Sequence, residues 1–234
     1  MAELTGNERR AYVRAMFARI AGRYDLMNTV MTGGMHHHWR TLAARVAASG
    51  PPGTALDIAT GTGDLALSLA RQPHIQKVIG LDLVPQMVSL AQAKARGRLG
   101  LVVGDGLSLP FADNTFCCAA SAFGLRNMPD VPATLAELAR VVQPGGKVVI
   151  LDIIPREEKS PLRPLFRLFF HWVVPLAGQI ITGDREAYTY LPRSVDRFMT
   201  REGVRDLFTD LGLKDVGFRS LGLGTIAIHW GVKA

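Results

Sequence analysis

Five short apolar runs divide the central part of the chain, and polar or turn-forming stretches separate them. The runs that predict strands lie at residues 54–59, 77–82, 101–103, 115–121 and 147–154. The segments that carry apolar residues at helical spacing lie at 64–71, from Pro85 onwards and at 132–142. Strands that alternate with helices in this way predict an α/β fold with a doubly wound, mostly parallel sheet.

The end of the chain adds one helix and two strands to this pattern. Thr200 is placed to cap a helix that ends at Gly212. The apolar runs at 216–221 and 225–232 predict a closing strand pair, which brings the sheet to seven strands. His229 lies inside the last run, and we expect it to be a hydrogen-bonded core histidine rather than a base.

Two segments lie outside the alternating pattern. Helical patterns over 7–21 and after the Gly33-Gly34 break, the second with Trp39 on its apolar side, predict a helical lid over the turn that follows the first strand. We expect a single domain. Its predicted parts are a lid at 1–50, a cofactor-binding half at 54–154, a helical insertion after the fifth strand at 155–199, and a closing helix and strand pair at 200–234.

The insertion contains a segment, 161–182, that is rich in apolar and aromatic side chains. Arg163, Pro164, Arg167 and Pro175 interrupt it, so we expect it to be too broken and too charged to span a membrane. Two interpretations stay open. An aromatic helix with arginines can lie at a bilayer interface or wall an apolar tunnel, and it can equally pack on the lid as ordinary core.

The composition is that of one globular domain, with 234 residues, 48% of them hydrophobic and 20% charged. The adjacent Cys117 and Cys118 exclude an ordinary disulfide framework and offer no metal-binding spacing. The charged start lacks the apolar core of a secretory signal, so we expect a cytoplasmic protein or one peripheral to a membrane. A formal net charge of +7 suits an anionic bilayer surface, although solubility alone also accounts for it; we expect no nucleic-acid partner.

The run Leu-Asp-Ile-Ala-Thr-Gly-Thr-Gly-Asp-Leu at 56–65 reads as a strand, a glycine turn and a helix N-terminus. Gly61 and Gly63 allow a ligand to approach the backbone closely, and their spacing also fits a relaxed dinucleotide fingerprint. A dinucleotide places its diphosphate on that helix N-terminus, where the carboxylates of Asp57 and Asp64 would repel it. They favour a nucleoside that carries positive charge, and S-adenosylmethionine has both an ammonium and a sulfonium group.

Two further acids follow the next strands. Asp82 lies about 20 residues beyond the glycines, the spacing at which a carboxylate accepts hydrogen bonds from ribose hydroxyls. Asp105 follows the third strand, where it is placed to accept from the adenine amino group while Gly106 leaves room for the ring. Asp57, Asp82 and Asp105 all fall at the carboxyl edge of the predicted sheet, where open α/β proteins bind ligands.

The loop after the fourth strand brings an aromatic, a guanidinium and an amide together as Phe123, Arg126 and Asn127. Arg126 and Asn127 are suited to grip an oxygen-bearing ring. The alternatives are that Arg126 pairs with an acid of the lid and that Asn127 caps the following helix. The run at 36–38 is three histidines, but consecutive helical residues point about 100° apart, so we expect no metal site there.

Taken together, the motifs resemble the class I methyltransferases that C-methylate a prenylated benzoquinol or naphthoquinol in ubiquinone and menaquinone biosynthesis. The resemblance runs nearly end to end. Its most specific stretches are Tyr-Asp-Leu-Met-Asn at 24–28, Phe-Gly-Leu-Arg-Asn at 123–127 and Tyr-Thr-Tyr-Leu-Pro-Arg-Ser at 188–194. The glycine run at 56–64 and Pro-Gly-Gly-Lys at 144–147 also match, but such motifs recur in many methyltransferases.

The resemblance places Thr62, Asp82, Asp105 and Gly106 at positions that the family uses for S-adenosylmethionine. The chain departs from the family at two positions. Ala122 stands where the family commonly has a serine that contacts the cofactor, and the neighbouring Ser121 should point to the other side of the strand. On the fifth strand, Asp152 stands where the family often has glutamate.

Methyl transfer to an aromatic carbon needs an electron-rich ring, which a hydroquinone provides when a hydroxyl loses its proton. A guanidinium is a poor base but stabilises a phenolate, and we expect this role for Arg126. Asn127 would orient the ring oxygen and Tyr24 would help to close the lid, while the resemblance implies substrate contacts for Phe123, Tyr188 and Tyr190. No metal is needed, and the sequence does not identify the general base.

The leading expectation is S-adenosylmethionine-dependent C-methylation of a lipid quinol, with demethylmenaquinol slightly favoured over the ubiquinone precursor. An alternative is methylation of another apolar acceptor, such as a sterol or a phospholipid. A second alternative is a nucleotide-binding partner protein without turnover. Transient contact with the inner face of the membrane and assembly into a homodimer are further expectations.

Overall fold

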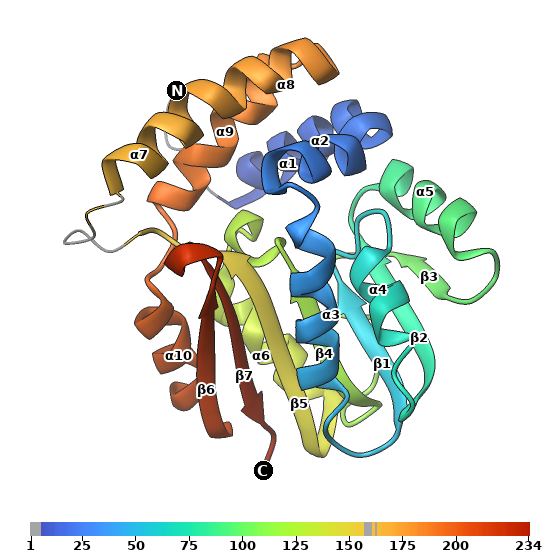
Figure 1. Cartoon of the computed structure of the whole chain (residues 1–234). Coiled ribbons are helices and arrows are strands. Elements are labelled where there is room, and N and C mark those ends of the chain that lie inside the picture. Colours follow the sequence, from blue (N-terminus) through green and yellow to red (C-terminus); the bar gives the residue numbers. More distant parts are fainter. Residues whose placement is uncertain (1–5, 157–160, 162) are drawn as a thin grey trace.

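A central sheet of seven strands carries helices on both faces and a group of helices over one end (Figure 1). The computed structural model describes residues 6–156, 161 and 163–234. The strand order is β3-β2-β1-β4-β5-β7-β6. The strands are β1 Gly53–Ile58, β2 Ile75–Asp82, β3 Gly100–Val103, β4 Phe116–Ala122, β5 Val142–Ile153, β6 Lys214–Leu221 and β7 Ile226–Val232. The predicted doubly wound sheet is confirmed, because β1 to β5 run parallel and only β7 runs against its two neighbours.

The strand order places the end of β1 at the point where the chain changes direction across the sheet. β2 and β3 extend to one side of β1, and β4 and β5 extend to the other. At the β1–β2 pair, Ile58 lies opposite Leu81, so Asp82 ends its strand beside the turn that follows β1. This is the switch point at which open α/β sheets bind ligands, in the crevice beyond the carboxyl ends of their strands.

Helices that pack on the sheet bury its two apolar faces. They are α3 Met35–Ala47, α4 Asp64–Leu69, α5 Pro85–Ala95, α6 Val131–Val141 and α10 Arg201–Asp210. Thr200 caps α10 as expected, because its hydroxyl oxygen accepts a hydrogen bond of 3.1 Å from the backbone N–H of Gly203.

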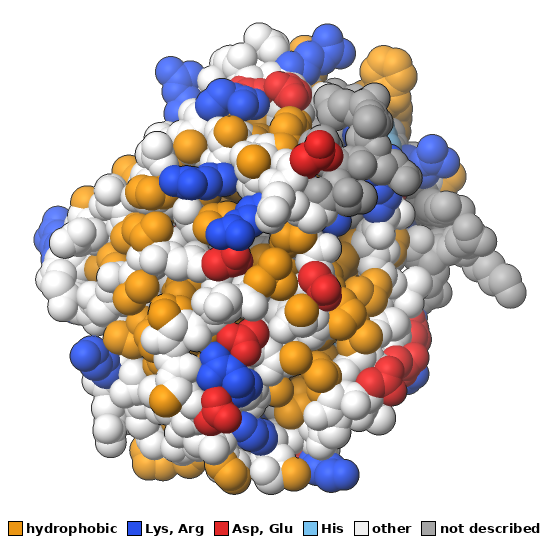
Figure 2. All heavy atoms as spheres, turned by 180° about the vertical axis from the view of Figure 1, so that it is seen from behind, with side chains coloured by type: hydrophobic (Ala, Val, Ile, Leu, Met, Phe, Trp, Pro, Cys, Tyr) orange, Lys and Arg blue, Asp and Glu red, His pale blue; other side chains and the backbone are white. Residues whose placement is uncertain are grey.

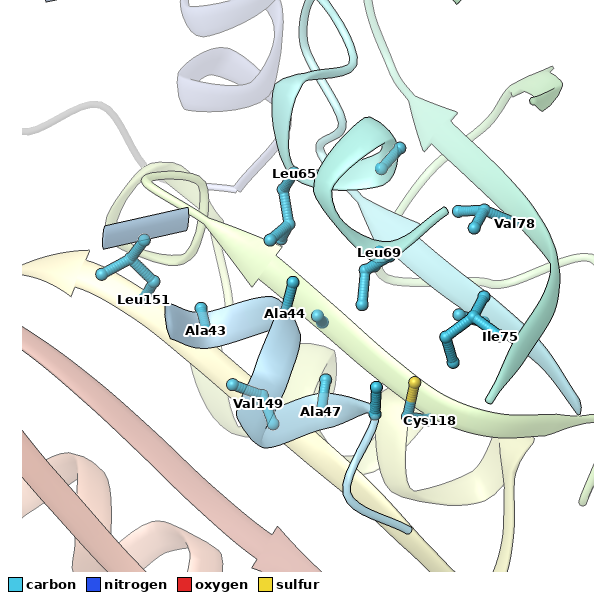
Figure 3. Packing of buried hydrophobic residues seen from close by; sticks show 14 of the residues in the cluster. Ala43, Ala44, Ala47, Leu65, Leu69, Ile75, Val78, Cys118, Val149 and Leu151 are labelled. Carbon is cyan, nitrogen blue, oxygen red and sulfur yellow. The ribbon is translucent and has the colours of Figure 1, made fainter. Parts of the chain in front are cut away.

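The position of α3 corrects one expectation. The sequence pattern places it in the lid, but its small residues Ala43, Ala44 and Ala47 lie against Leu69 and Val149 in the core of the sheet (Figure 3). These alanines let the helix approach the strands closely. The segment that lies over the glycine turn is therefore formed by α1 Gly6–Ile20, the short turn η1 Ala21–Arg23 and α2 Tyr24–Thr32. We call these three elements the lid.

The insertion after β5 forms a helical pair over the lid (Figure 1). Its elements are α7 Arg163–Leu168, a π-helical turn η3 Phe169–Val173, α8 Val174–Thr182 and α9 Arg185–Asp196. Residues 157–160 and 162 of the predicted insertion lie outside the described residues. Buried Val174 and half-buried Ala177 and Ile181 pack with α9 and with Met16 and Met27 of the lid. The insertion thus shares one apolar core with the lid.

The expected interruption of this segment is wrong. The residues Pro164–Thr182 form one continuous helix that, by length and composition alone, is sufficient to cross a membrane. The π-helical turn ends at Val173, two residues before Pro175, so the wider turn includes the carbonyl of His171 that a proline at 175 would crowd in a regular α-helix. Only 17% of the most apolar 18-residue stretch of this helix is buried.

Candidate functional site

The glycine turn after β1 is joined to the end of β2 by a carboxylate. Gly61 and Gly63 adopt positive φ angles of +55° and +85°, which other residues rarely adopt. The backbone N–H of Gly61 donates to Asp82 Oδ2 at 2.7 Å, and the N–H of Val84 donates to Asp82 Oδ1 at 2.9 Å. Asp82 is therefore fixed at the mouth of the cleft, where its remaining lone pairs can face a ligand.

The acids under the turn are held in a desolvated setting. Burial raises the pKa of Asp57 to about 7, against the opposing effect of the Thr60 hydroxyl, which donates to its Oδ2 at 2.7 Å. Its Oδ1 is buried without a hydrogen-bond partner. Burial also raises the pKa of Asp82. A cationic ligand group beside these carboxylates would restore their charge, so the donor set fits the ammonium of S-adenosylmethionine.

Asp64 does not act as the sequence argument supposes. Lys94 Nζ lies 2.8 Å from Asp64 Oδ1, and Arg40 Nη1 lies 3.8 Å from its Oδ2. Burial raises the pKa of Asp64, but the hydrogen bond from Lys94 and the positive charges of Arg40 and Lys94 together outweigh it, so the pKa is lowered. The negative charge of Asp64 at the helix N-terminus is thus neutralised. Asp57, and not both acids, would therefore repel a diphosphate.

The lid is tied to the predicted cofactor residues by charged contacts. The Thr62 hydroxyl donates to Asp25 Oδ1 at 2.6 Å, and Lys94 Nζ lies 2.6 Å from Asp25 Oδ2. On the other side of the turn, Arg10 Nη1 lies 3.0 Å from Asp105 Oδ2. The atoms that would receive a nucleoside are thus engaged by α1 and α2.

The cofactor cleft is narrow with the lid in this position. Tyr24 and Phe17 of the lid face Gly61, Asp82 and Gly106 across a space of about 90 Å³. Pockets that enclose a ligand usually measure about 300–1,000 Å³. With the lid in this position the cleft is therefore smaller than the usual ligand pocket, and we expect the lid to move when a nucleoside binds.

A larger, mainly apolar cavity of about 390 Å³ lies next to this cleft. We call it the acceptor cavity; α1, α2, α3, η2 Leu125–Asn127, α7, η3 and α9 contribute to its wall. Tyr24, Phe123 and Asn127 line both the cleft and the cavity, so the two spaces meet at these side chains. The three predicted residues are brought together as the sequence indicates.

Unpaired polar atoms are concentrated at the acceptor cavity. Within the part of the chain that the structure describes, five buried polar atoms without a hydrogen-bond partner belong to residues that line it: Asn28 Nδ2, Arg126 Nε, Asn127 Oδ1, Tyr188 Oη and Tyr190 Oη. A buried polar group without a partner costs about 1–3 kcal/mol. Their concentration at one cavity indicates a ligand that is apolar overall and carries several oxygens.

Arg126 forms its ion pair with an acid of β5 and not with an acid of the lid. Its Nη1 lies 2.6 Å from Asp152 Oδ1, and its backbone N–H donates to Asp152 Oδ2 at 3.1 Å. The alternative of a lid acid is therefore wrong, and the fifth-strand acid is the partner. The capping alternative for Asn127 is also wrong, because Asp130 caps α6 by accepting from the Ala133 N–H at 2.9 Å.

The loop that carries Arg126 is strained where it meets the cofactor cleft. Phe123 has a φ of +63°, and the guanidinium carbon of Arg40 lies 5.0 Å from the centre of its ring. Ala122 lines the cleft and Ser121 does not, as the alternation of the strand predicts. The Ser121 hydroxyl is buried away from the cleft and has no hydrogen-bond partner. Ser121 therefore does not take over the cofactor contact of the serine that the family commonly has at position 122.

The histidine run is closer to a metal-binding geometry than the sequence argument allows. Among the described residues, ligand atoms of His36, His37 and Asp64 lie within 4.8 Å of one another, so the argument that neighbouring helical histidines cannot converge is wrong. However, Arg40 Nη1 contacts His36 Nδ1 and approaches Asp64. The guanidinium of Arg40 thus already provides the positive charge that a metal ion would bring to these side chains. His229 bonds the Arg201 carbonyl through Nε2 at 2.9 Å, as expected of a core histidine.

Arg40, Lys94 and Asn28 are site residues that the sequence analysis does not single out. Arg40 faces Asp57 and Gly61 in a small space of about 20 Å³ beneath the turn. Asn28 lies within the Tyr-Asp-Leu-Met-Asn motif, which is the one signal that could have indicated it. Arg40 and Lys94 stand on ordinary amphipathic helices, and only the packing of those helices brings them to the turn.

A third cavity, of about 470 Å³, lies on the other side of Arg126 and Tyr190. Arg9, Arg193 and Arg197 also line it, and Glu186 is the acid at its edge. Seen from behind, Lys and Arg side chains are spread over both the upper and the lower half of the molecule, with Asp and Glu side chains among them (Figure 2). The arginines that line this cavity make it locally basic.

The known proteins that the chain resembles agree with this geometry. The model of the ubiE/COQ5 methyltransferase family matches residues 4–233. A Desulfotalea psychrophila protein named ubiquinone/menaquinone biosynthesis C-methyltransferase UbiE is 42% identical over 94% of this chain and 90% of its own length. A Thermus thermophilus demethylmenaquinone methyltransferase is 40% identical over 92% of this chain and 99% of its own.

Solved structures show the same fold at low sequence identity. The chain matches a Haloferax volcanii complex between the Trm112 methyltransferase activator and a methyltransferase with a TM-score of 0.65, at 21% identity over 93% of this chain and 97% of the other. The seven-stranded class I fold, the acids at the strand ends and the family match lead to one conclusion. The chain belongs to the ubiE/COQ5 methyltransferase family, and it is an S-adenosylmethionine-dependent methyltransferase.

Proposed function

We propose that this enzyme methylates a ring carbon of a prenylated quinol and that demethylmenaquinol is its substrate. The observation that carries the proposal is the acceptor cavity, in which apolar walls surround a group of unpaired donors and acceptors. This combination suits a hydrocarbon molecule with two ring oxygens. The names of the similar proteins support the same acceptor class, and demethylmenaquinone is the acceptor named most often among them.

The cofactor supplies an electrophilic methyl group when it is bound. Asp82 and Asp105 would hold its ribose and adenine, Gly61, Thr62, Gly63 and Gly106 would shape the cleft, and Asp57 would face its ammonium group. Arg40 lies beside Asp57 and is placed to bind a carboxylate. Tyr24 and Phe17 of the lid would exclude water from the space between the cleft and the acceptor cavity.

The residues of η2 would bind the ring oxygen at the reacting end. Arg126 keeps an unpaired Nε–H, although its Nη1 is engaged by Asp152, and this N–H would donate to the quinolate oxygen. Asn127 Oδ1 would accept from the hydroxyl before it ionises. Stabilising the quinolate in this buried place raises the electron density of the adjacent ring carbon.

Protons must leave both the hydroxyl and the methylated carbon. Asp152 is a poor acceptor for them, because Arg126 and two backbone N–H groups already occupy its oxygens. Burial raises the pKa of Tyr188, so its hydroxyl stays protonated and serves as a donor to the second ring oxygen. We propose that water accepts the protons. His36 is buried and lines the cavity, but Arg40 contacts its Nδ1 and the Thr29 hydroxyl lies 3.2 Å from its Nε2, so both ring nitrogens are engaged.

The competing acceptors are distinguished by one incubation. The purified enzyme, methyl-labelled cofactor and a lipid extract should yield a labelled quinone. Label in a sterol or phospholipid fraction would point to the other acceptor class. Calorimetry that detects binding of a nicotinamide dinucleotide but not of S-adenosylmethionine would support a protein without turnover, and would overturn the proposal.

A lipid acceptor implies work at a membrane surface. We propose that the enzyme is cytoplasmic and touches the inner face of the membrane transiently. A homodimer stays a prediction, and the mass measured by light scattering at several concentrations tests it.

A further inference from the structure

Exposed large hydrophobic side chains are concentrated at one end of the molecule. Among the described residues, all of them but Leu90 and Val103 belong to α2, the start of α3, the helix Pro164–Thr182 or the turn η4 Gly222–Gly224. They are Leu26, Val30, Met35, Leu165, Leu168, Trp172, Val173, Leu176, Ile180 and Leu223. Large contiguous apolar surfaces mark interaction sites.

The helix Pro164–Thr182 presents this surface along one side. Leu165, Leu168, Trp172, Leu176 and Ile180 recur every three or four residues, and each of them is more than half exposed. The other side of the helix packs on α9 and the lid. The pair α7–α8 lies at the outer edge of the molecule, and no other described helix or strand lies above it (Figure 1). A helix with one face fixed to the domain can lie along a membrane but cannot cross it without unpacking.

The same helix separates the apolar surface from the acceptor cavity. Phe166, Phe169 and Phe170 line the cavity, while their neighbours Leu165, Leu168 and Trp172 face outwards. Leu223, which is 79% exposed, lines the cavity from η4. The cavity of about 390 Å³ suits the ring and the first part of a prenyl chain. The rest of the chain must leave past these side chains.

The charges around the surface favour an anionic bilayer over a second copy of the chain. Arg167 on the helix and Arg23 beneath its end are both exposed, and the residues Pro164–Thr182 include no acid. A two-fold interface would place this basic surface against itself. Next to anionic lipid, each basic residue instead contributes about 1 kcal/mol.

We propose that the outer face of the helix Pro164–Thr182, with Leu26, Val30 and Leu223, docks on an anionic bilayer, and that the quinol passes from the bilayer into the acceptor cavity beneath this helix. The inference rests on the proposed lipid-quinol substrate. It names the surface and the route by which that substrate reaches the site.

The test compares two charge-matched double variants. Leu176→Glu with Ile180→Glu places two carboxylates on the docking face, and Gln76→Glu with Val103→Glu places two at exposed positions of β2 and β3. With phosphatidylglycerol vesicles, the first pair should lower the partition coefficient by more than about tenfold, because two side chains lose their apolar burial. The second pair should bind as the wild type does.

Turnover separates docking from chemistry. The docking-face pair should lose activity on a long-chain quinol in vesicles, but should keep cofactor affinity and activity on a short-chain, water-soluble quinol. Wild-type inactivity on the soluble quinol would refute the proposed function, whereas the docking inference is judged by vesicle binding alone. Unchanged vesicle binding by the docking-face pair, or loss of a dimer without loss of vesicle binding, would overturn the inference.

Trp172 provides a direct probe of depth. Phospholipids brominated in their acyl chains should quench part of the tryptophan emission of the bound protein, and Trp172→Phe should remove that quenched part. Trp39 and Trp230, the other tryptophans, are largely buried and should not respond. Quenching that persists in Trp172→Phe would place another surface against the lipid.

Discussion

At the scale of single residues, the proposed chemistry depends on the buried pair of Arg126 and Asp152. The carboxylate fixes Nη1 and the backbone N–H, and Nε is left as a buried donor without a partner. The pair therefore works as a positioned hydrogen-bond donor more than as a bare positive charge. Sequence reasoning identified the arginine, but the partner acid stands 26 residues away on β5.

Arg126→Ala should lower kcat by about 100- to 1,000-fold, the usual effect of removing one donor to a developing oxyanion. Cofactor affinity should change little, because Arg126 does not line the cofactor cleft. Steady-state kinetics on a soluble quinol and calorimetry with the cofactor measure the two effects. Arg193→Ala removes a guanidinium from the neighbouring cavity and is the matched control, with kcat expected at the wild-type value. Near-normal turnover in Arg126→Ala would refute the assigned role.

The acid Asp57 makes cofactor affinity depend on pH. Its pKa of about 7 means that it is largely neutral at pH 6 and largely ionised at pH 8. The ammonium of the cofactor is attracted to the ionised form, so affinity should rise by about tenfold from pH 6 to pH 8. Calorimetry at the two pH values measures this, and Asp57→Asn should flatten the dependence. Tighter binding at pH 6 than at pH 8 would contradict the account.

At the scale of elements, the lid is held over the cleft by a few partly exposed ion pairs and by a small apolar cluster in which Ala21 packs with Val84 and Met87. Arg10 binds Asp105, and Lys94 joins Asp25 to the helix after the turn. Such pairs contribute at most about 1 kcal/mol each and the apolar cluster is small, so we expect the lid to open without unfolding the sheet. The cofactor residues that the lid engages become available when it does.

Asp25→Ala should release the lid while the sheet stays intact. Deuterium exchange should become faster in residues 6–32 and remain unchanged in β1 and β4, and the free energy of unfolding should fall by less than about 1 kcal/mol. Asp113→Ala removes a similar exposed ion pair with Arg140, far from the lid, and should leave exchange in residues 6–32 unchanged. Faster exchange throughout the sheet would show that the pair stabilises the whole fold instead.

Two elements show the limits of reading helices from periodicity. The hydrophobic pattern of α3 indicates one apolar face, but it does not show whether that face packs on the lid or on the sheet. Its small alanines fit close packing on the sheet, and this meaning becomes clear only from the structure. In the insertion, Pro175 looks like a break in the sequence. The π-helical turn that accommodates it has no signature in the hydrophobic pattern.

At the scale of the whole molecule, the sheet and its acids could be predicted because strand ends in a parallel sheet share one edge. The β strands lie within two residues of their expected bounds, except that β5 begins at Val142, five residues before the expected start. Asp57, Asp82 and Asp105 line adjoining spaces at the ends of the strands. Arg40, Lys94 and the Arg10 contact could not be predicted. They depend on how helices distant in sequence pack around the turn, which no local spacing encodes.

The acceptor is the central claim, and it can be measured in cells. Quinones extracted from a strain without this gene should contain demethylmenaquinone in place of menaquinone, as shown by a mass lower by one methylene group. The wild-type gene should restore menaquinone, and the gene that encodes Arg126→Ala should not. Menaquinone at normal levels in the strain without the gene would contradict the account.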